Sequence, residues 1–378
     1  MPLSRAIVCR GRHDQNGWKI EEVQLRELKD DELLVRIVAS GICHTDLMFG
    51  DRPDDIGGWP RVMGHEGSGY VQKTGAKVTV ARVGDPVLLS FAACRSCKMC
   101  VDGHASHCAD ATRINFCGSK VFSSASSISS QPDILGLFFG QSSFSNLSIV
   151  NESSVVNVAS LVKSEDELRL FSPLGCGIQT GSGTIVNVAN ATPSDTVAIM
   201  GAGGVGLAAV MGAKIARCST IIIIDRVQQR LELAKELGAT HAIHTGSMKD
   251  LDELVKQVRE LTGGYGTTIT MDATGVVPLI CKGIEFTARR GQYIQVGSTG
   301  PDAVIKLPIQ EFMTSGKRIM GAVEGQVTPQ EYVPKMISWY RAGEFPFNKL
   351  VTLYRAEDFM DALGSMKSGE VIKPIIAW

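Results

Sequence analysis

The chain has 378 residues, of which 44% are hydrophobic, with 40 glycines, ten cysteines and a formal net charge of −1. Nothing in this balance indicates nucleic-acid or membrane binding, which rely on an excess of basic residues. No apolar run approaches the roughly 18 residues of a membrane span, and no basic-then-apolar signal opens the chain, so we expect a cytoplasmic protein. In a reducing compartment, ten cysteines favour metal sites over disulfides, and the length allows two domains.

The first ninety residues show the alternating apolar and polar pattern of short strands that are separated by turns. Apolar residues alternate over 6–9, 18–22, 32–40, 67–73 and 85–91, with frequent glycines between these runs. This pattern predicts a β-rich, partly barrel-like unit rather than a series of βαβ units.

Two short motifs in this unit carry candidate metal ligands: CHTD at 43–46 and GHEG at 64–67. A thiolate from Cys43 and an imidazole from His65 suit zinc, and Cys176 in LGCG at 174–177 can supply a third ligand. Three protein ligands leave a fourth position open, as a catalytic zinc requires. Asp46 and Glu66 flank the ligands as carboxylates that would orient His65 or tune the metal. A buried thiol and a core histidine are the alternative reading of either residue alone.

A second cysteine cluster follows at Cys94, Cys97, Cys100 and Cys108. The segment is polar and has almost no core of its own, so it folds if four thiolates close around a tetrahedral metal. The spacing predicts a structural zinc over about 94–108, and unrelated free thiols are the alternative.

Residues 118–131 are rich in serine and nearly uncharged, which predicts a mobile surface loop. The aromatic stretch at 137–141 that follows is equally consistent with a pocket wall and with core packing.

From about residue 178 to 323 the pattern changes to alternating strands and helices. A strand at 196–200 leads into GAGGVG at 201–206, then an apolar helix to 216, then four isoleucines that end at Asp225. This context is the dinucleotide-binding fingerprint, in which the glycines allow a tight turn, close approach to a pyrophosphate and helix packing. A glycine-rich turn without a ligand is the alternative. The expected cofactor contacts in this region are Gly201, Gly203, Gly204, Val205, Gly206, Asp225 and Arg226.

Further elements are predicted as helices at 228–237 and 250–261 and strands at 241–244, 267–272 and 291–297. After these the chain should return to the first domain, where Lys373 is predicted near a cofactor phosphate, with an exposed surface lysine as the alternative. The predicted fold is therefore α/β, with a β-rich catalytic domain at 1–177 and 324–378 and a doubly wound parallel sheet at 178–323.

Taken together, these motifs resemble the zinc-dependent medium-chain alcohol dehydrogenases, and within them the aryl- or benzyl-alcohol branch. The resemblance covers essentially the whole chain, and implies a GroES-like catalytic domain and a Rossmann cofactor domain. It implies two zincs per chain, with Cys43, His65 and Cys176, beside Glu66, at the catalytic one. It further implies homodimers or homotetramers that pair through the cofactor domains near residues 302–318. The remaining implied roles are proton acceptance for Thr45, pyrophosphate contact for His44, nicotinamide contact for Thr180 and Val296, and ribose contact for Asp225 and Arg230.

The implied reaction is the interconversion of a primary alcohol and its aldehyde. Zinc would act as a Lewis acid on the alcohol, and NAD would accept the hydride. Asp225 would repel the 2′-phosphate of NADP, although the adjacent Arg226 could attract it. Aromatic or allylic substrates are expected from the branch and from aromatic side chains near the motifs, namely Phe49, Trp59, Phe91 and Phe139.

Three alternatives remain. The same site could serve a specialised reductase or dehydrogenase of a cyclic or unsaturated intermediate. A glutathione-adduct dehydrogenase would need a basic anchor for the glutathione carboxylates, and no clear one is present. A non-catalytic zinc- and nucleotide-binding protein would have no need for an open metal site.

The sequence departs from the family at Met48. Many members carry a histidine there that passes the alcohol proton from the threonine to solvent, and a thioether cannot do this. The end of the proton path is therefore not assigned by the resemblance.

Overall fold

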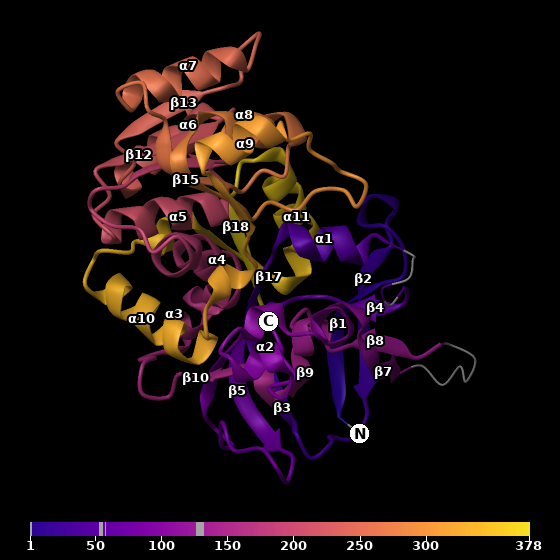
Figure 1. Cartoon of the computed structure of the whole chain (residues 1–378). Helices are drawn as coiled ribbons and strands as arrows, with labels where there is room; N and C mark the ends of the chain where they lie inside the picture. Colours follow the sequence, from indigo (N-terminus) through magenta and orange to yellow (C-terminus); the bar gives the residue numbers. More distant parts are fainter. Residues whose placement is uncertain (1, 53–55, 57, 126–131) are drawn as a thin grey trace. The chain divides into compact units, whose positions relative to one another are not determined.

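The computed structural model describes residues 2–52, 56, 58–125 and 132–378. The chain divides into two compact units. Unit 1 comprises Met1–Cys176, Thr328–Ser338 and Asn348–Trp378, and unit 2 comprises Gly177–Val327 and Trp339–Phe347. Figure 1 shows the elements of both, coloured along the chain. Within the described residues, no helix combines the length and the apolar character needed to span a bilayer.

Unit 1 contains a small closed barrel, in agreement with the predicted barrel-like character. Its strands, in spatial order, are β1 (Leu3–Cys9), β2 (Trp18–Leu25), β7 (Ser119–Ser124), β8 (Ile134–Gly136) and β4 (Arg61–Val62). Trp18, Phe138 and Phe144 are almost completely buried in the core that the barrel strands share with the neighbouring elements.

The second sheet of unit 1 joins the two ends of the chain. Its strands run in the order β10 (Val155–Asn157), β6 (Pro86–Leu89), β5 (Glu66–Thr74), β3 (Glu32–Gly41), β18 (Lys373–Ala377) and β17 (Val351–Arg355), with β9 (Leu147–Asn151) also paired to β3. The return of the C-terminal segment is clear in this sheet, because Ile376 of β18 lies opposite Ser40 of β3. The helices of this unit are α1 (His44–Gly50), α2 (Lys98–Val101), α3 (Glu165–Leu170), α11 (Phe359–Ser368) and most of α10 (Pro329–Arg341).

The prediction of a loop over residues 118–131 was wrong for its first part. Residues 119–124 form β7, which pairs with β2 and β8. Val121 and Phe122 are each 2% exposed, so two apolar side chains among the serines anchor a barrel strand. The predicted loop residues 126–131 lie outside the described residues.

Unit 2 is built on a parallel sheet in the order β13 (His241–His244), β12 (Thr220–Asp225), β11 (Thr196–Met200), β14 (Thr267–Asp272), β15 (Thr287–Gln295) and β16 (Arg318–Gly321). Every neighbouring pair in this sheet is parallel. Its helices are α4 (Gly177–Gly183), α5 (Gly204–Ile215), α6 (Gln228–Leu237), α7 (Asp252–Leu261), α8 (Val277–Phe286) and α9 (Ile309–Ser315). Helix α5 contacts α4 and α6, whereas α7 contacts α8, as expected for helices on the two faces of a doubly wound sheet.

The order of these strands brings the ends of several strands together. Met200 of β11 lies opposite Ile224 of β12 on one side and opposite Asp272 of β14 on the other. Strands β12 and β13 follow on one side of β11, and β14, β15 and β16 on the other, so the strand order reverses at β11. Ligands of doubly wound sheets bind outside the carboxyl ends of strands at such a switch point. The residues after β11, β12 and β15, including Gly201 and Val296, lie at this edge.

Candidate metal centres and dinucleotide site

One buried carboxylate joins the two ligand motifs of unit 1. Asp46 is 0% exposed, and its Oδ2 accepts the backbone N–H of Cys43 at 2.9 Å. Its Oδ1 accepts the Gly64 N–H at 3.0 Å and lies 2.9 Å from Nδ1 of His65. The carboxylate thus favours a proton on Nδ1 and leaves Nε2 of His65 with its lone pair available to a metal.

The ligand atoms of Cys43, His65, Glu66 and Cys176 all lie within 4.8 Å of one another. His65 Nε2 is buried and has no hydrogen-bond partner among the residues that the structure describes. A buried nitrogen without a partner is uncommon, and a metal bound to it would satisfy it. A hydrogen bond from Cys176 lowers the pKa of the Cys43 thiol well below its usual range, which favours the thiolate form that binds metals. Two thiolates and an imidazole are the donor set of a catalytic zinc.

Glu66 of this cluster is paired with Lys373, the residue that we expected near a cofactor phosphate. Lys373 Nζ lies 2.8 and 2.9 Å from the two carboxylate oxygens of Glu66 and donates to the carbonyl of Ile42 at 3.2 Å. These contacts account for all three ammonium N–H groups, and Lys373 is only 4% exposed. Burial alone would lower the pKa of the Lys373 ammonium. The attraction of the Glu66 carboxylate outweighs burial, so the pKa is raised.

The predicted proton-transfer residues lie on α1, whose N-cap is Cys43. Thr45 Oγ1 is 3.7 Å from the sulfur of Cys43, so the hydroxyl is beside the candidate metal centre. His44 is exposed, and Met48 is half-buried and packs against the core of unit 1. Within α1, therefore, Thr45 is the polar side chain placed next to a ligand sulfur.

Aromatic rings surround the candidate ligand His65. The Phe139 ring is stacked on the imidazole with centroids 4.5 Å apart, and Phe138 meets it edge-on at 5.5 Å. Phe116 contacts Phe139 at 5.3 Å and stacks on Phe49 at 4.6 Å. Of the four aromatic residues named from the sequence, Phe49 and Phe139 belong to this cluster, while Trp59 and Phe91 pack in the surrounding core. Phe116 was missed, because it lies in a segment without a motif.

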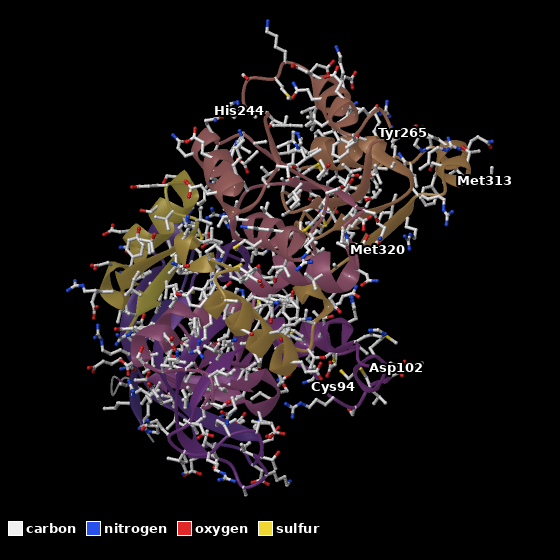
Figure 2. The ribbon with its side chains drawn as sticks, turned by 90° about the vertical axis from the view of Figure 1, so that its left-hand side faces the viewer. Cys94, Asp102, His244, Tyr265, Met313 and Met320 are labelled. Carbon is white, nitrogen blue, oxygen red and sulfur yellow. The ribbon has the colours of Figure 1, made fainter. Side chains whose placement is uncertain are left out.

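The four-cysteine lobe has the geometry of a closed metal site. The sulfurs of Cys94, Cys97, Cys100 and Cys108 lie within 4.8 Å of one another, and those of Cys94 and Cys100 are 3.9 Å apart. Four sulfurs at 2.3 Å from one zinc would be about 3.8 Å apart, so the cluster fits this ion. Figure 2 labels Cys94 and Asp102 in this lobe.

Backbone groups of the lobe also favour the thiolate form of Cys94 and Cys97. The N–H of Cys97 donates to the Cys94 sulfur at 3.3 Å, and the N–H of Ala109 donates to the Cys97 sulfur at 3.4 Å. Hydrogen bonds from the backbone N–H groups of Ser96 and Cys97 lower the pKa of Cys94 to about 6. Charged sulfurs at this spacing repel one another, and a bound dication would compensate that charge.

The glycine-rich turn of unit 2 has the backbone that its sequence predicts. Gly201 has a φ of +98°, which favours glycine, and a Cβ on Gly206 would lie 1.7 Å from the Gly201 carbonyl oxygen. A Cβ on Gly203 would meet no heavy atom within 4 Å, so the chain is open at this point. The N-terminus of α5 begins there, and such a terminus favours the negative charge of a pyrophosphate. These features fit a dinucleotide.

Asp225 lies at the end of β12 and is fixed by the adjacent loops. Its carboxylate accepts the N–H of Ala202 at 2.6 Å and that of Val227 at 2.8 Å. Arg226 is exposed and Arg230 is partly buried on α6. The carboxylate is thus held beside the glycine-rich turn, where it can meet a ribose.

The two residues expected near the nicotinamide lie in unit 2, and each makes a hydrogen bond there. Thr180 is buried on α4, with its hydroxyl 3.3 Å from Glu324 Oε2. Val296 follows β15, and its N–H donates to the carbonyl of Asp272 at 2.9 Å. Asp272 was given no role from the sequence, yet its buried carboxylate also accepts from the N–H of Gly275 and from Gln295, both at 2.8 Å. It therefore organises the loops after β14 and β15.

Comparisons with known proteins agree with this architecture. Residues 29–160 match the Alcohol dehydrogenase GroES-like domain, and residues 204–342 match the family described as Zinc-binding dehydrogenase. The chain is 37% identical over 361 residues to the geraniol dehydrogenase of Castellaniella defragrans, covering 95% of this chain and 94% of that protein. It is 33% identical to an S-(hydroxymethyl)glutathione dehydrogenase of Synechocystis sp., covering 95% of each.

A solved structure gives the same result. The benzyl alcohol dehydrogenase of Acinetobacter calcoaceticus superposes with a TM-score of 0.89 at 33% identity, covering 100% of this chain and 99% of that one. The family and the fold class predicted from the sequence are thereby confirmed. The chain belongs to the zinc-dependent medium-chain alcohol dehydrogenases, and is an alcohol–aldehyde oxidoreductase.

Proposed function

We propose that the protein oxidises primary aromatic or allylic alcohols to aldehydes with NAD, and reduces the aldehydes in reverse. The observation that carries this proposal is the aromatic cluster around His65, in which Phe139 stacks on the imidazole at 4.5 Å. Aromatic side chains favour flat, π-bearing groups through offset-stacked and edge-to-face contacts. The names of two relatives support the same class, because geraniol is an allylic primary alcohol and benzyl alcohol an aromatic one.

Cys43, His65 and Cys176 would hold a catalytic zinc, with Glu66 next to it. The four cysteines of the lobe would hold a second, structural zinc. When bound, the catalytic zinc supplies a Lewis acid and NAD supplies a hydride acceptor. The count of two zincs per chain rests on the two clusters of sulfur and nitrogen donors.

The side chains of unit 1 would orient the substrate and move its proton. Asp46 fixes the protonation of His65 through the 2.9 Å contact to Nδ1. The Thr45 hydroxyl, 3.7 Å from the Cys43 sulfur, would accept the proton of the substrate alcohol while passing on its own. Met48 cannot continue this path, so the proton would leave through a cofactor ribose hydroxyl, His44 or water.

The residues of unit 2 would hold NAD rather than NADP. The turn from Gly201 to Gly206, including Gly203, Gly204 and Val205, would accommodate the pyrophosphate at the N-terminus of α5. Asp225 would accept hydrogen bonds from the adenosine ribose, where Arg230 would assist, and would repel a 2′-phosphate. Thr180 and Val296 would border the nicotinamide, whereas His44, to which the resemblance assigns the pyrophosphate contact, belongs to unit 1.

The protein would form homodimers or homotetramers through unit 2. Val304, Ile309 and Met313, which precede β16 in the chain, are 78%, 71% and 64% exposed. Figure 2 labels Met313 in this region. Large apolar side chains that are exposed within one short segment favour association between copies. Light scattering of the purified chain measures the oligomeric state.

The site assignment is tested by replacing one ligand and one unrelated cysteine. Cys176→Ser should remove one zinc per chain, measured by elemental analysis, and abolish turnover of benzyl alcohol. Cys218→Ser, at a buried cysteine in unit 2, should retain both zincs and the activity. Retention of both metals and of turnover in Cys176→Ser would rule out the proposed centre.

A further inference from the structure

The buried side-chain amide of Gln141 contacts the backbone of the candidate ligand His65 and is not part of the aromatic cluster described above. Gln141 is 0% exposed and follows the aromatic pair Phe138 and Phe139. We propose that Gln141 is a positioning residue that holds the His65 and Cys176 segments in register for metal binding. The proposal rests on the proposed function only for the assignment of the metal ligands.

All three hydrogen-bonding groups of the Gln141 amide are used. Nε2 donates to the backbone carbonyl of His65 at 2.8 Å and to that of Ser90 at 3.0 Å. Oε1 accepts the backbone N–H of Gly67 at 3.0 Å. The Gln141 side chain thus fixes the backbone on both sides of Glu66 and connects that backbone to the segment that contains Ser90.

These contacts lie where the pairing of β5 with β6 ends. The ladder pairs Tyr70 with Pro86 and Ser68 with Leu88. At the next positions the Gln141 amide lies between Gly67 and His65 on one side and Ser90 on the other. It supplies hydrogen-bond partners to three buried backbone groups at the point where the chain enters the metal centre.

Ser90 extends this connection to the other ligand segment. Its hydroxyl donates to the carbonyl of Gly175 at 2.6 Å, immediately before Cys176. Gly175 also lies so close to β6 that a Cβ there would be 1.9 Å from the Leu89 carbonyl oxygen. The series His65, Gln141, Ser90, Gly175 therefore links the segments that carry two of the three proposed ligands.

The backbone of Gln141 is itself anchored. Its N–H donates to the carbonyl of Phe138 at 3.0 Å, and its carbonyl accepts the hydroxyl of buried Ser148. Leu137 and Phe139 have φ values of +61° and +53°, a conformation that non-glycine residues adopt rarely. Strain of this kind persists where surrounding contacts over-determine the backbone, which these bonds do.

The chemistry requires a neutral amide at this position. Gln141 donates twice and accepts once, whereas a carboxylate of the same shape can only accept. Gln141→Glu would place a carboxylate oxygen against the carbonyls of His65 and Ser90. Gln141→Met keeps the length of the side chain but removes all three bonds.

The test uses Co²⁺ as the probe metal in the full-length protein, because cobalt–thiolate absorption reports ligand geometry. The part of the spectrum that Cys43→Ser abolishes is assigned to the proposed catalytic centre. We expect Gln141→Met and Gln141→Glu to shift these bands and to weaken metal binding at this centre by about 10- to 100-fold, as outer contacts of metal ligands typically do.

The matched control is Asn115→Leu. Asn115 is also a buried amide with three hydrogen bonds, to Ala92 N–H and to the carbonyls of Ala92 and Ala111, at 2.9, 3.0 and 3.0 Å. Its loss should lower thermal stability by a similar amount but leave the catalytic-centre bands unchanged. Unchanged bands and metal affinity in folded Gln141→Met would overturn the proposal, whatever its thermal stability.

Ser90→Ala provides a second, milder variant, because it removes only the bond to Gly175. It should shift the same bands to a smaller extent, and the absence of any shift would contradict the link to Cys176. Failure of the proposed function gives a different result: Cys43→Ser would then leave the wild-type spectrum intact.

Discussion

Lys373 and Glu66 form a buried ion pair in which Nζ lies 2.8 and 2.9 Å from the two carboxylate oxygens. The pair joins the first residue of β18 to the first residue of β5. It places a carboxylate within the cluster of candidate ligands while compensating its charge. The fold of unit 1 and the metal centre are therefore coupled through this contact.

Removing one partner of the pair should strongly destabilise the protein. Lys373→Met leaves the buried Glu66 carboxylate without its ammonium partner, and we expect a loss of about 3–5 kcal/mol in the free energy of unfolding. Lys373→Met combined with Glu66→Gln should recover much of that loss. The measurement is urea denaturation of the metal-loaded protein.

The control is Arg5→Met, which breaks the exposed pair between Arg5 and Glu357 at 2.9 Å. Such surface pairs contribute about 0–1 kcal/mol. Equal effects of Lys373→Met and Arg5→Met would show that the buried pair carries no special stabilisation.

Met48→His should raise the rate of alcohol oxidation near neutral pH by up to about tenfold, because it restores one general base to the proton path. In the parent protein the rate should rise into the alkaline range, without a limb from a relay histidine. Met48→Leu is the matched control and should leave the profile unchanged. The idea fails if Met48→His leaves the neutral rate unaltered although a solvent isotope effect shows that proton transfer limits turnover.

Asp225→Ser should narrow the preference for NAD over NADP. A few kcal/mol of repulsion and lost ribose hydrogen bonds correspond to roughly 100-fold or more in selectivity. The ratio of kcat/KM for the two cofactors measures this effect. Equal kcat/KM values with NAD and NADP in the parent protein would refute the assignment of Asp225, and would point to Arg226 as a phosphate contact.

Cys100→Ser should lower stability and remove one metal per chain without removing the other. The lobe around Cys94 depends on its four sulfurs, because it has few apolar contacts of its own. Elemental analysis and thermal unfolding are the measurements. Cys281→Ser, at an exposed cysteine of unit 2, should keep both metals, and identical results for the two variants would exclude a structural zinc in the lobe.

We expect ionised Glu32 to make the free energy of unfolding depend on pH in the acid range. Burial alone would raise its pKa, but Arg26, at 2.7 Å from each carboxylate oxygen, and the Lys29 N–H at 2.9 Å outweigh burial and lower the pKa. Because the folded-state pKa lies below the unfolded value of about 4.3, this stabilisation is present above that pH and is lost as the pH falls through the folded-state pKa.

Glu32→Gln should accordingly lower the free energy of unfolding by about 1–3 kcal/mol at pH 7. The difference from the parent protein should shrink as the pH falls below about 4. Asp14→Asn, at an exposed pair with Arg12, serves as the control and should show little effect at either pH. A difference that stayed constant with pH would mean that the ionised carboxylate is not the stabilising form.

The sequence predicted the elements whose pattern is local. The strands at Thr196–Met200 and Thr267–Asp272 and the helix at Gln228–Leu237 were placed at their observed bounds. Helix α8 was missed, since β-branched residues and Gly283 give it low helix propensity. The helix packs closely at Gly283, because a Cβ there would lie 2.5 Å from Met200 Cε and 2.8 Å from Tyr293 Cε2. The predicted strand at 291–297 begins earlier, at Thr287.

The candidate site shows the same division. Cys43 and His65 were recognisable from their motifs, but nothing local indicated that Gln141 would reach the backbone of His65. Lys373 was associated with a cofactor from its place in the tail, whereas its partner Glu66 lies 307 residues earlier. Such contacts depend on strand pairing between distant segments, which residue spacing does not encode.

The central claim is tested most directly by kcat/KM of the metal-loaded protein with NAD for matched alcohols. Benzyl alcohol is compared with cyclohexylmethanol, and an allylic primary alcohol with its saturated analogue. Aromatic contacts of about 0.5–1.5 kcal/mol predict about 2- to 12-fold higher kcat/KM for the unsaturated member of each pair. Turnover confined to short aliphatic alcohols or polyols, or no turnover of any alcohol, would contradict the account.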